Sequence, residues 1–387
     1  MTKYVLLASL LFAACGDNND NGDDSPLDGG IDAPVDSAPA APRAVIATGN
    51  FSSAGLLSVL DIATKTIMTN VAPATSVGVD PVVRKVGNEL FVVNRASGNS
   101  ITVLKASDFS LVEQLATGAG SNPYDVAVVG SKLYVPVYGG TGLVVLTRGT
   151  STSTTIALGA TEDPDNKPNC ATAYAVGTKV FVGCQLLDDA NSFASRGLTG
   201  RVYVIDTTTN TVAATLMLST ENPTSMFEQL PSTATHAGDL VVGTSDYGTG
   251  AGCLERITTG ATPTAAGCLR TNAELGGFAN RVDFSTTKMV VSVGRADFSG
   301  GDVRTIDLAT DALDAAKYNK ADQPIQEAAV CPDGTVVMAE TPPFSTTTPP
   351  VPPPQGLRLY SAAGVETTTT AIDIGMKANS THGLYCY

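Results

Sequence analysis

A unit of roughly 40 to 55 residues recurs along the chain, and this repetition limits the folds that the sequence can adopt. It is clearest from Asn122, in NPYDVAVVGSKLYVPVYGGTGLVVLTRGTSTSTTIALG, and related segments begin at Asp80, Arg201 and Asp302. Short runs rich in Val and Thr alternate with Gly, Asn-Pro or Asp-Gly turns about every ten residues, while helical periodicity is almost absent. Each unit is therefore expected to form four antiparallel strands, A to D, that follow one another along the chain.

The segments VVNRASGNSITVLKASDFSLV and VYVIDTTTNTVAATL resemble the YVTN-type β-propeller repeat. That repeat pairs a Val/Tyr-rich strand with Asn and an Asp-x-x-Thr-x-x-Val turn. The resemblance is distinct in the second, third, fourth and sixth units and vague in the fifth and seventh. It implies an all-β fold of radially arranged blades and specifies no chemistry. Trp is absent from the chain, which argues against WD40 blades and the tryptophan-docked blades of quinoprotein dehydrogenases.

The order of strands at the two ends of the repeat predicts how the ring closes. AVIATGN, GLLSVLDIATK and TIMTNV match strands B, C and D, with no A strand before them, while HGLYCY at the C-terminus occupies an A position. We therefore predict a seven-bladed β-propeller over residues 44–387, in which the last strand completes the first blade and removes exposed sheet edges. A last strand that joins no blade is the alternative.

The first residues follow the plan of a secretory signal peptide. Lys3 gives a positive start, Tyr4 to Phe12 form an apolar run, and Ala13 and Ala14 precede Cys15. The apolar run is about nine residues long, whereas a membrane-spanning helix needs roughly 20. Residues 1–14 are therefore expected to be removed after export.

LFAAC resembles the lipobox of bacterial lipoproteins, with Phe12 in place of the commoner residue. The resemblance implies a diacylglycerol on the Cys15 thiol and a further acyl chain on its amine, which together attach stably to a membrane. The alternative is an ordinary signal peptide that leaves a free thiol. Gly16 does not match the Asp that retains some lipoproteins in the inner membrane, so the expected location is the cell envelope, at the outer membrane.

Residues 15–43 are expected to be a disordered acidic tether, because Asp, Asn, Gly, Pro and Ala dominate and offer little surface to bury. The tether holds seven aspartates, which contribute half of the net charge of −14. The string DNNDNGDD could ligate calcium, yet it lacks the Glu that closes an EF-hand loop. The sequence indicates no cofactor beyond this possible calcium, and no metal site is assigned. The acidity argues against nucleic acid as a partner.

The six cysteines after Cys15 favour disulfides, because their number is even and the chain is exported. Cys170 and Cys184 bracket the predicted A–B turn of blade 4 and lie opposite each other. Cys253 and Cys268 bracket the turn at Gly260 in blade 5. The remaining pair, Cys331 and Cys386, would join the A strands of blades 7 and 1 if their Cα atoms come within about 7 Å.

No catalytic motif is recognisable in the sequence. With only two histidines, His236 and His382, a Ser-His-Asp triad has few ways to form, and we interpret both as structural. Carboxylates are plentiful, but their spacing cannot pair them across blades. Whether the chain is an enzyme stays open, and a non-catalytic role is favoured.

Unequal loop lengths predict where binding occurs. The B–C connections are short in blades 2 and 3 but long in blades 4, 6 and 7 and intermediate in blade 5, and the D–A loop TEDPDNKPN ahead of blade 4 should share their face. Long loops on a rigid scaffold commonly carry function. The candidate binding residues are Asp163, Asp165, Asp188, Asp189, Arg196, Asp246, Tyr247, Arg295, Asp297 and Phe344.

Three functional hypotheses follow. The first is a membrane-anchored binding scaffold for a protein, peptide or glycan. The second is a propeller hydrolase or lactonase with a carboxylate-lined central site that uses calcium, and it requires several Asp, Glu or Asn side chains to converge at the channel mouth. The third is a redox or metal-handling propeller, which the lack of Trp and scarcity of His make least favoured. Fold analogy alone does not decide among them.

Overall fold

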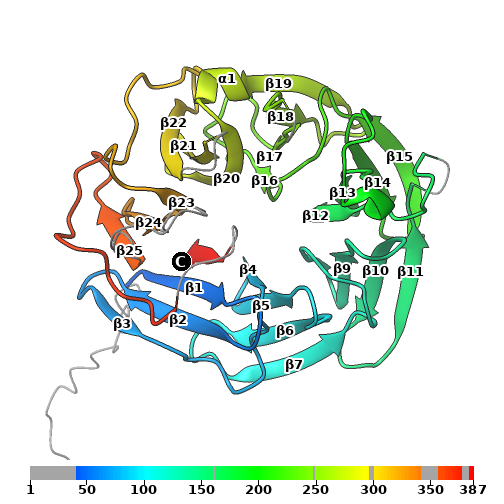
Figure 1. Ribbon diagram of the computed structural model, residues 1–387, viewed down its shortest axis with the longest axis horizontal. Coiled ribbons are helices and arrows are strands. Elements are labelled where there is room, and N and C mark those ends of the chain that lie inside the picture. Colours follow the sequence, from blue (N-terminus) through cyan, green and yellow to red (C-terminus); the bar gives the residue numbers. More distant parts are fainter. Residues whose placement is uncertain (1–40, 160–161, 247–248, 296–299, 341–355, 377–382) are drawn as a thin grey trace, which may run out of the picture. The chain divides into compact units, whose positions relative to one another are not determined.

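The computed structural model describes residues 41–159, 162–246, 249–295, 300–340, 356–376 and 383–387, and they form seven antiparallel sheets in a ring (Figure 1). Helix within this part of the chain is limited to α1 (Asn272–Leu275) and one 3₁₀ turn (Asp189–Asn191). No helix there is long and apolar enough to cross a membrane. The predicted all-β, seven-bladed propeller is confirmed.

Each blade runs from an innermost strand at the channel to an outermost strand at the rim. Blade 1 is β26 (Leu384–Cys386), β1 (Arg43–Gly49), β2 (Gly55–Asp61) and β3 (Thr66–Met68); blade 2 is β4 (Pro81–Val86), β5 (Glu89–Asn94), β6 (Ser100–Lys105) and β7 (Leu111–Ala116); blade 3 is β8 (Ala127–Val129), β9 (Lys132–Pro136), β10 (Gly142–Thr147) and β11 (Ser153–Ala157).

The later blades follow the same order. Blade 4 is β12 (Cys170–Val176), β13 (Lys179–Cys184), β14 (Arg201–Asp206) and β15 (Thr211–Met217); blade 5 is β16 (Glu228–Gln229), β17 (Leu240–Gly243), β18 (Cys253–Ile257) and β19 (Ala265–Thr271); blade 6 is β20 (Phe278–Phe284), β21 (Lys288–Gly294) and β22 (Gly301–Asp307); blade 7 is β23 (Ile325–Val330), β24 (Val336–Glu340) and β25 (Gly356–Tyr360).

Buried hydrophobic side chains of the described residues form seven clusters, one at each interface between neighbouring blades. Successive residues of a strand point to opposite faces of its sheet, so the Val- and Ile-rich strands supply two interfaces at once. Val45 packs against blade 2, whereas Ile46 packs against blade 7. This explains why the middle strands carry continuous apolar runs, while the outer strand β15 is mostly exposed.

The C-terminal strand closes the ring as predicted. β26 pairs with β1, with Ala44 opposite Cys386 and Ile46 opposite Leu384. Arg43 and Tyr387 exchange two backbone hydrogen bonds of 2.8 and 2.9 Å. The two ends of the propeller therefore meet where the other blades have an A–B turn.

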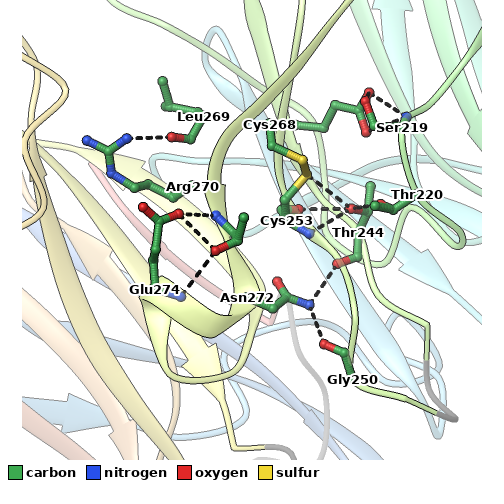
Figure 2. The surroundings of a disulfide bond; sticks show 12 residues. Ser219, Thr220, Thr244, Gly250, Cys253, Cys268, Leu269, Arg270, Asn272 and Glu274 are labelled. Atoms are coloured by element: carbon green, nitrogen blue, oxygen red, sulfur yellow. Dashed lines mark hydrogen bonds between the residues drawn. A yellow bond between two sulfur atoms is a disulfide. The ribbon is translucent and has the colours of Figure 1, made fainter.

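Three disulfides join the six cysteines in the predicted pairs. Cys170 lies opposite Cys184 on β12 and β13, and Cys331 reaches Cys386 with a Cα–Cα distance of 4.8 Å. Figure 2 shows the third, between Cys253 on β18 and Cys268 on β19. Beside it, the Cys253 backbone N–H donates to the Thr244 hydroxyl at 3.1 Å.

In blades 6 and 7 the described residues form three-stranded sheets rather than four-stranded ones. Bends replace the fourth strand of blade 6: the Val303 N–H donates to Asn319 Oδ1 at 2.7 Å, and the Tyr318 N–H donates to the Val303 carbonyl at 2.8 Å. A side-chain amide thus satisfies a backbone group that a strand would otherwise pair.

Candidate functional site

The long β13–β14 connection of blade 4 meets the loop ahead of β12 in a cluster of charges. Arg196 lies at its centre, with Nη2 2.8 Å from Asp165 Oδ2 and 3.4 Å from Asp188 Oδ1. Its Nε lies 3.7 Å from Asp163 Oδ1. The Asp189 N–H donates to Asp165 Oδ2 at 3.1 Å. We call Asp163, Asp165, Asp188, Asp189 and Arg196 the blade-4 cluster, and all five were predicted from sequence.

Asp163 is the most buried member of the cluster, with an exposed fraction of 2%. Its Oδ2 has no hydrogen-bond partner among the described residues. Burial and the adjacent Asp165 carboxylate raise the pKa of Asp163 to about 6. The pKa of Asp165 is lowered although burial opposes this, because the N–H groups of Asp189 and Lys167 donate to its carboxylate. The pKa values of the two neighbouring carboxyl groups are thereby shifted in opposite directions.

Two other predicted binding residues, Asp246 and Arg295, lie in different blades from this cluster. Asp246 accepts a hydrogen bond from the Thr249 hydroxyl in the β17–β18 loop of blade 5. Arg295 forms a bidentate ion pair with Asp302 in blade 6, with N–O distances of 3.1 and 2.7 Å. Tyr247, Asp297, Phe344, Cys15 and His382 lie outside the described residues.

A row of stacked side chains, which sequence reasoning missed, connects the loops of blades 2, 3 and 4. The Arg95 guanidinium carbon lies 4.8 Å from the ring centroid of Tyr124. Tyr124 stacks on Tyr138 with centroids 4.6 Å apart, and Phe193 lies 5.7 Å from Tyr138. We call these four side chains the aromatic row. They all come from B–C or D–A loops, so the row shares the face of the blade-4 cluster.

Phe193 ends the row in an unusual conformation. Its exposed fraction is 50%, and its φ of 60° lies in the left-handed region that bulky residues rarely adopt. The Phe193 N–H donates to the Asp188 carbonyl at 2.8 Å, and the Asp188 N–H donates to the Ala194 carbonyl at 3.0 Å. These bonds hold the ring outward beside the acidic loop. Backbone strain of this kind is often retained at functional sites.

The channel holds a second set of charges on the innermost strands. Arg84 of β4 binds both oxygens of Asp125 at 2.8 Å through Nε and Nη2, and its Nη1 lies 3.0 Å from Glu228 Oε1 of β16. Asp125 also accepts from the Ala173 N–H at 2.9 Å and the Thr172 hydroxyl at 3.2 Å. This network joins blades 2, 3, 4 and 5.

The charges of the network set the pKa of Arg84. Burial alone would lower this pKa, but the carboxylates of Asp125 and Glu228 outweigh the effect of burial and raise it.

A matching network joins blades 6, 7 and 1. Arg281 of β20 lies 2.6 Å from Glu327 Oε1 of β23. The other oxygen of Glu327 accepts from the N–H groups of Gly383 and Leu384 at 2.9 and 3.2 Å. Asp283 Oδ2 accepts from the Val330 N–H at 2.9 Å. Burial raises the pKa of Glu327 and of Asp283, and Arg281 only partly offsets this.

A cavity of about 320 Å³ adjoins the channel networks. Its lining includes Arg84, Tyr174, Glu228 and Tyr385, and it extends along β4 to Gly87 in the β4–β5 turn. Because an A–B turn borders it, the cavity opens on the face opposite the aromatic row.

Carboxylates therefore do line the channel, as the hydrolase hypothesis requires, but arginines and backbone N–H groups bind them. In the described part of the chain, no three His, Cys, Asp or Glu side chains are grouped so as to hold a metal ion. Among the described residues, the channel carboxylates Asp125 and Glu327 are thus held in networks that join neighbouring blades.

No protein-family model matches the sequence, and no match is found among characterised proteins. Solved structures do match the fold. The β-propeller domain of Cps50 (Swd1) from Myceliophteria thermophila has a TM-score of 0.53 at 9% identity, covering 76% of this chain and 90% of that one. Apo AztD from Citrobacter koseri has a TM-score of 0.52 at 13% identity, covering 89% and 97%. At these identities the likeness shows the propeller fold alone.

Proposed function

We propose that the chain is a lipid-anchored binding protein of the cell envelope, whose loop face captures a protein or peptide segment rich in basic side chains. The observation that carries the proposal is the aromatic row, which ends on the exposed Phe193 beside the blade-4 cluster. Anchoring at Cys15, in the outer membrane, is part of the proposal and is supported by the sequence.

Basic segments fit the chemistry of this surface. The blade-4 cluster has four carboxylates and one guanidinium, and the Lys167 ammonium lies 3.2 Å from Asp189. A Lys or Arg side chain would gain both from these carboxylates and from the face of the Phe193 ring. The hydrogen bonds that fix Phe193 reduce the conformational entropy that is lost on binding. A glycan partner would stack on the Phe193 ring and would not require the carboxylates.

Peptide selection tests this proposal directly. Random 12-residue peptides displayed on phage should yield Lys- or Arg-containing binders on the wild-type chain, and Phe193→Asn should weaken their affinity by about tenfold or more. Asn tolerates a left-handed backbone, so the fold is preserved. Phe51→Asn is the matched control, because Phe51 is 53% exposed with a φ of 58° in a blade 1 loop. Selected peptides without basic residues, or equal loss in both variants, would contradict the proposal.

Mass spectrometry tests the anchor. Protein extracted from membranes should begin at Cys15 and carry added acyl mass, and Cys15→Ser should release it from the membrane fraction. A wild-type chain that is soluble and unmodified would refute lipid anchoring while leaving the peptide-binding test unaffected.

A further inference from the structure

The cavity beside the channel contains polar groups that the propeller itself leaves unused. Glu228 Oε1 is bound to Arg84, but Oε2 has no partner among the described residues, and the side chain is 20% exposed. The hydroxyl groups of Tyr174 and Tyr385 likewise form no hydrogen bond within that part of the chain, and both residues line the cavity. One carboxylate oxygen and two phenol oxygens thus face the same space.

We propose that this cavity binds a small organic molecule through a primary ammonium group. Such a group has three N–H donors, and the cavity offers three oxygens that can accept them, on Glu228, Tyr174 and Tyr385. The volume of about 320 Å³ is at the lower end for ligand pockets, so a molecule the size of a short alkylamine or diamine fits, and a folded partner does not.

The charges of the channel favour a cation over an anion. Four carboxyl groups, Asp125, Glu228, Asp283 and Glu327, face two guanidinium groups, Arg84 and Arg281. Burial raises the pKa of Glu228, and an ammonium group bound beside it would favour its ionised form. An anion would have to displace Asp125 or Glu228 from Arg84, because that guanidinium already binds both. Lys85 lies at the rim, but its Nζ donates to the Gly87 carbonyl at 2.7 Å and sits 5.0 Å from the Tyr387 ring centroid.

Each of the two tyrosine rings already lies close to a guanidinium group. The Arg84 guanidinium carbon lies 5.8 Å from the Tyr174 centroid, and that of Arg281 lies 5.7 Å from the Tyr385 centroid. Burial and the nearby Glu228 raise the pKa of Tyr385 to about 12 and also raise that of Tyr174. Both phenols therefore stay neutral near pH 7 and can accept a hydrogen bond from an ammonium.

Calorimetric titration of the full chain with defined probes tests the site. 1-Pentylamine and 1,5-diaminopentane should bind, whereas 1-pentanol, glutarate and tetramethylammonium, which lacks N–H donors, should not. Tyr174→Phe and Tyr385→Phe should each weaken amine binding about three- to tenfold, and Glu228→Gln more than tenfold. The tyrosine variants remove hydroxyls that have no hydrogen-bond partner among the described residues, so we expect folding to be retained.

Tyr318→Phe is the control, because its hydroxyl donates to the Ser361 carbonyl away from the cavity. Equal binding of tetramethylammonium or glutarate, or unchanged affinity in the two tyrosine variants, would overturn the proposal. Phe193→Asn should leave amine binding unchanged, so failure of this site and failure of the loop-face proposal are distinguishable.

Discussion

At the scale of single residues, the Asp163 carboxyl is placed where its neutral form is favoured. Its pKa of about 6 exceeds the ordinary Asp value of 3.8. Its stabilising contribution is therefore complete below about pH 4 and is lost as the pH rises through about 6. Asp163→Asn, which is neutral at every pH, should remove this part of the pH dependence. Melting temperatures measured from pH 4 to 8 should fall less steeply through pH 6 in the variant.

The exposed Asp322→Asn is the control, and it should follow the wild-type curve. Identical pH profiles for wild type and Asp163→Asn would show that the carboxyl is not perturbed in solution. The loop lengths in the sequence predicted that Asp163 and its four partners share a loop face. It could not predict which carboxyl is buried, because that depends on how Arg196 divides its contacts between two loops.

At the scale of strands, the Cys331–Cys386 bridge fixes β26, which has only three residues to hold it in blade 1. Replacing both cysteines with Ser should lower the free energy of unfolding by up to about 4 kcal/mol, as the chain-entropy model gives for a loop of 55 residues. Hydrogen exchange should also become faster in β26 and β1. Urea unfolding and amide exchange provide the measurements.

The paired Cys253→Ser and Cys268→Ser variant serves as the comparison. The Cys253–Cys268 loop of 15 residues predicts a smaller decrease in the free energy of unfolding, of about 3 kcal/mol. Amide hydrogen exchange should become faster in blade 5 only. If exchange in β26 were unchanged without its bridge, the strand would be held by pairing alone.

The closing strand and all three cysteine pairs could be read from the sequence. Strand register places Cys170 opposite Cys184, Cys253 and Cys268 bracket a turn, and Cys331 and Cys386 are the pair that remains. The missing fourth strand of blade 6 could not be read in this way, because the Asn319 side chain there accepts from a backbone N–H that a strand would otherwise pair. The two-residue length of β16 was not predicted either.

At the scale of the whole propeller, two buried arginine networks line the channel, one joining blades 2 to 5 and the other joining blades 6, 7 and 1. Arg84→Ala would leave the Asp125 carboxylate buried without its guanidinium, so we expect a loss of about 3 to 5 kcal/mol in the free energy of unfolding. Urea denaturation followed by far-UV circular dichroism measures this. These contacts were not predictable, because they join residues from separate repeats and depend on side-chain directions across the channel.

Lys317→Ala provides the contrast. Lys317 also forms an ion pair, 2.6 Å from Asp302, but its side chain is 47% exposed. Loss of this ion pair should lower the free energy of unfolding by less than about 1 kcal/mol. Comparable losses in the two variants would mean that the channel network adds no more than a surface ion pair.

The meeting of Arg43 and Tyr387 has a mechanical consequence. Tension on the chain ahead of Arg43 would reach the propeller at β1, an inner strand that is hydrogen-bonded to β26 on one side and to β2 on the other. Force would therefore spread over two ladders at once, and the Cys331–Cys386 bridge would pass part of it to blade 7. When the propeller is pulled at β1, unfolding therefore does not begin with the detachment of an exposed outer strand such as β3.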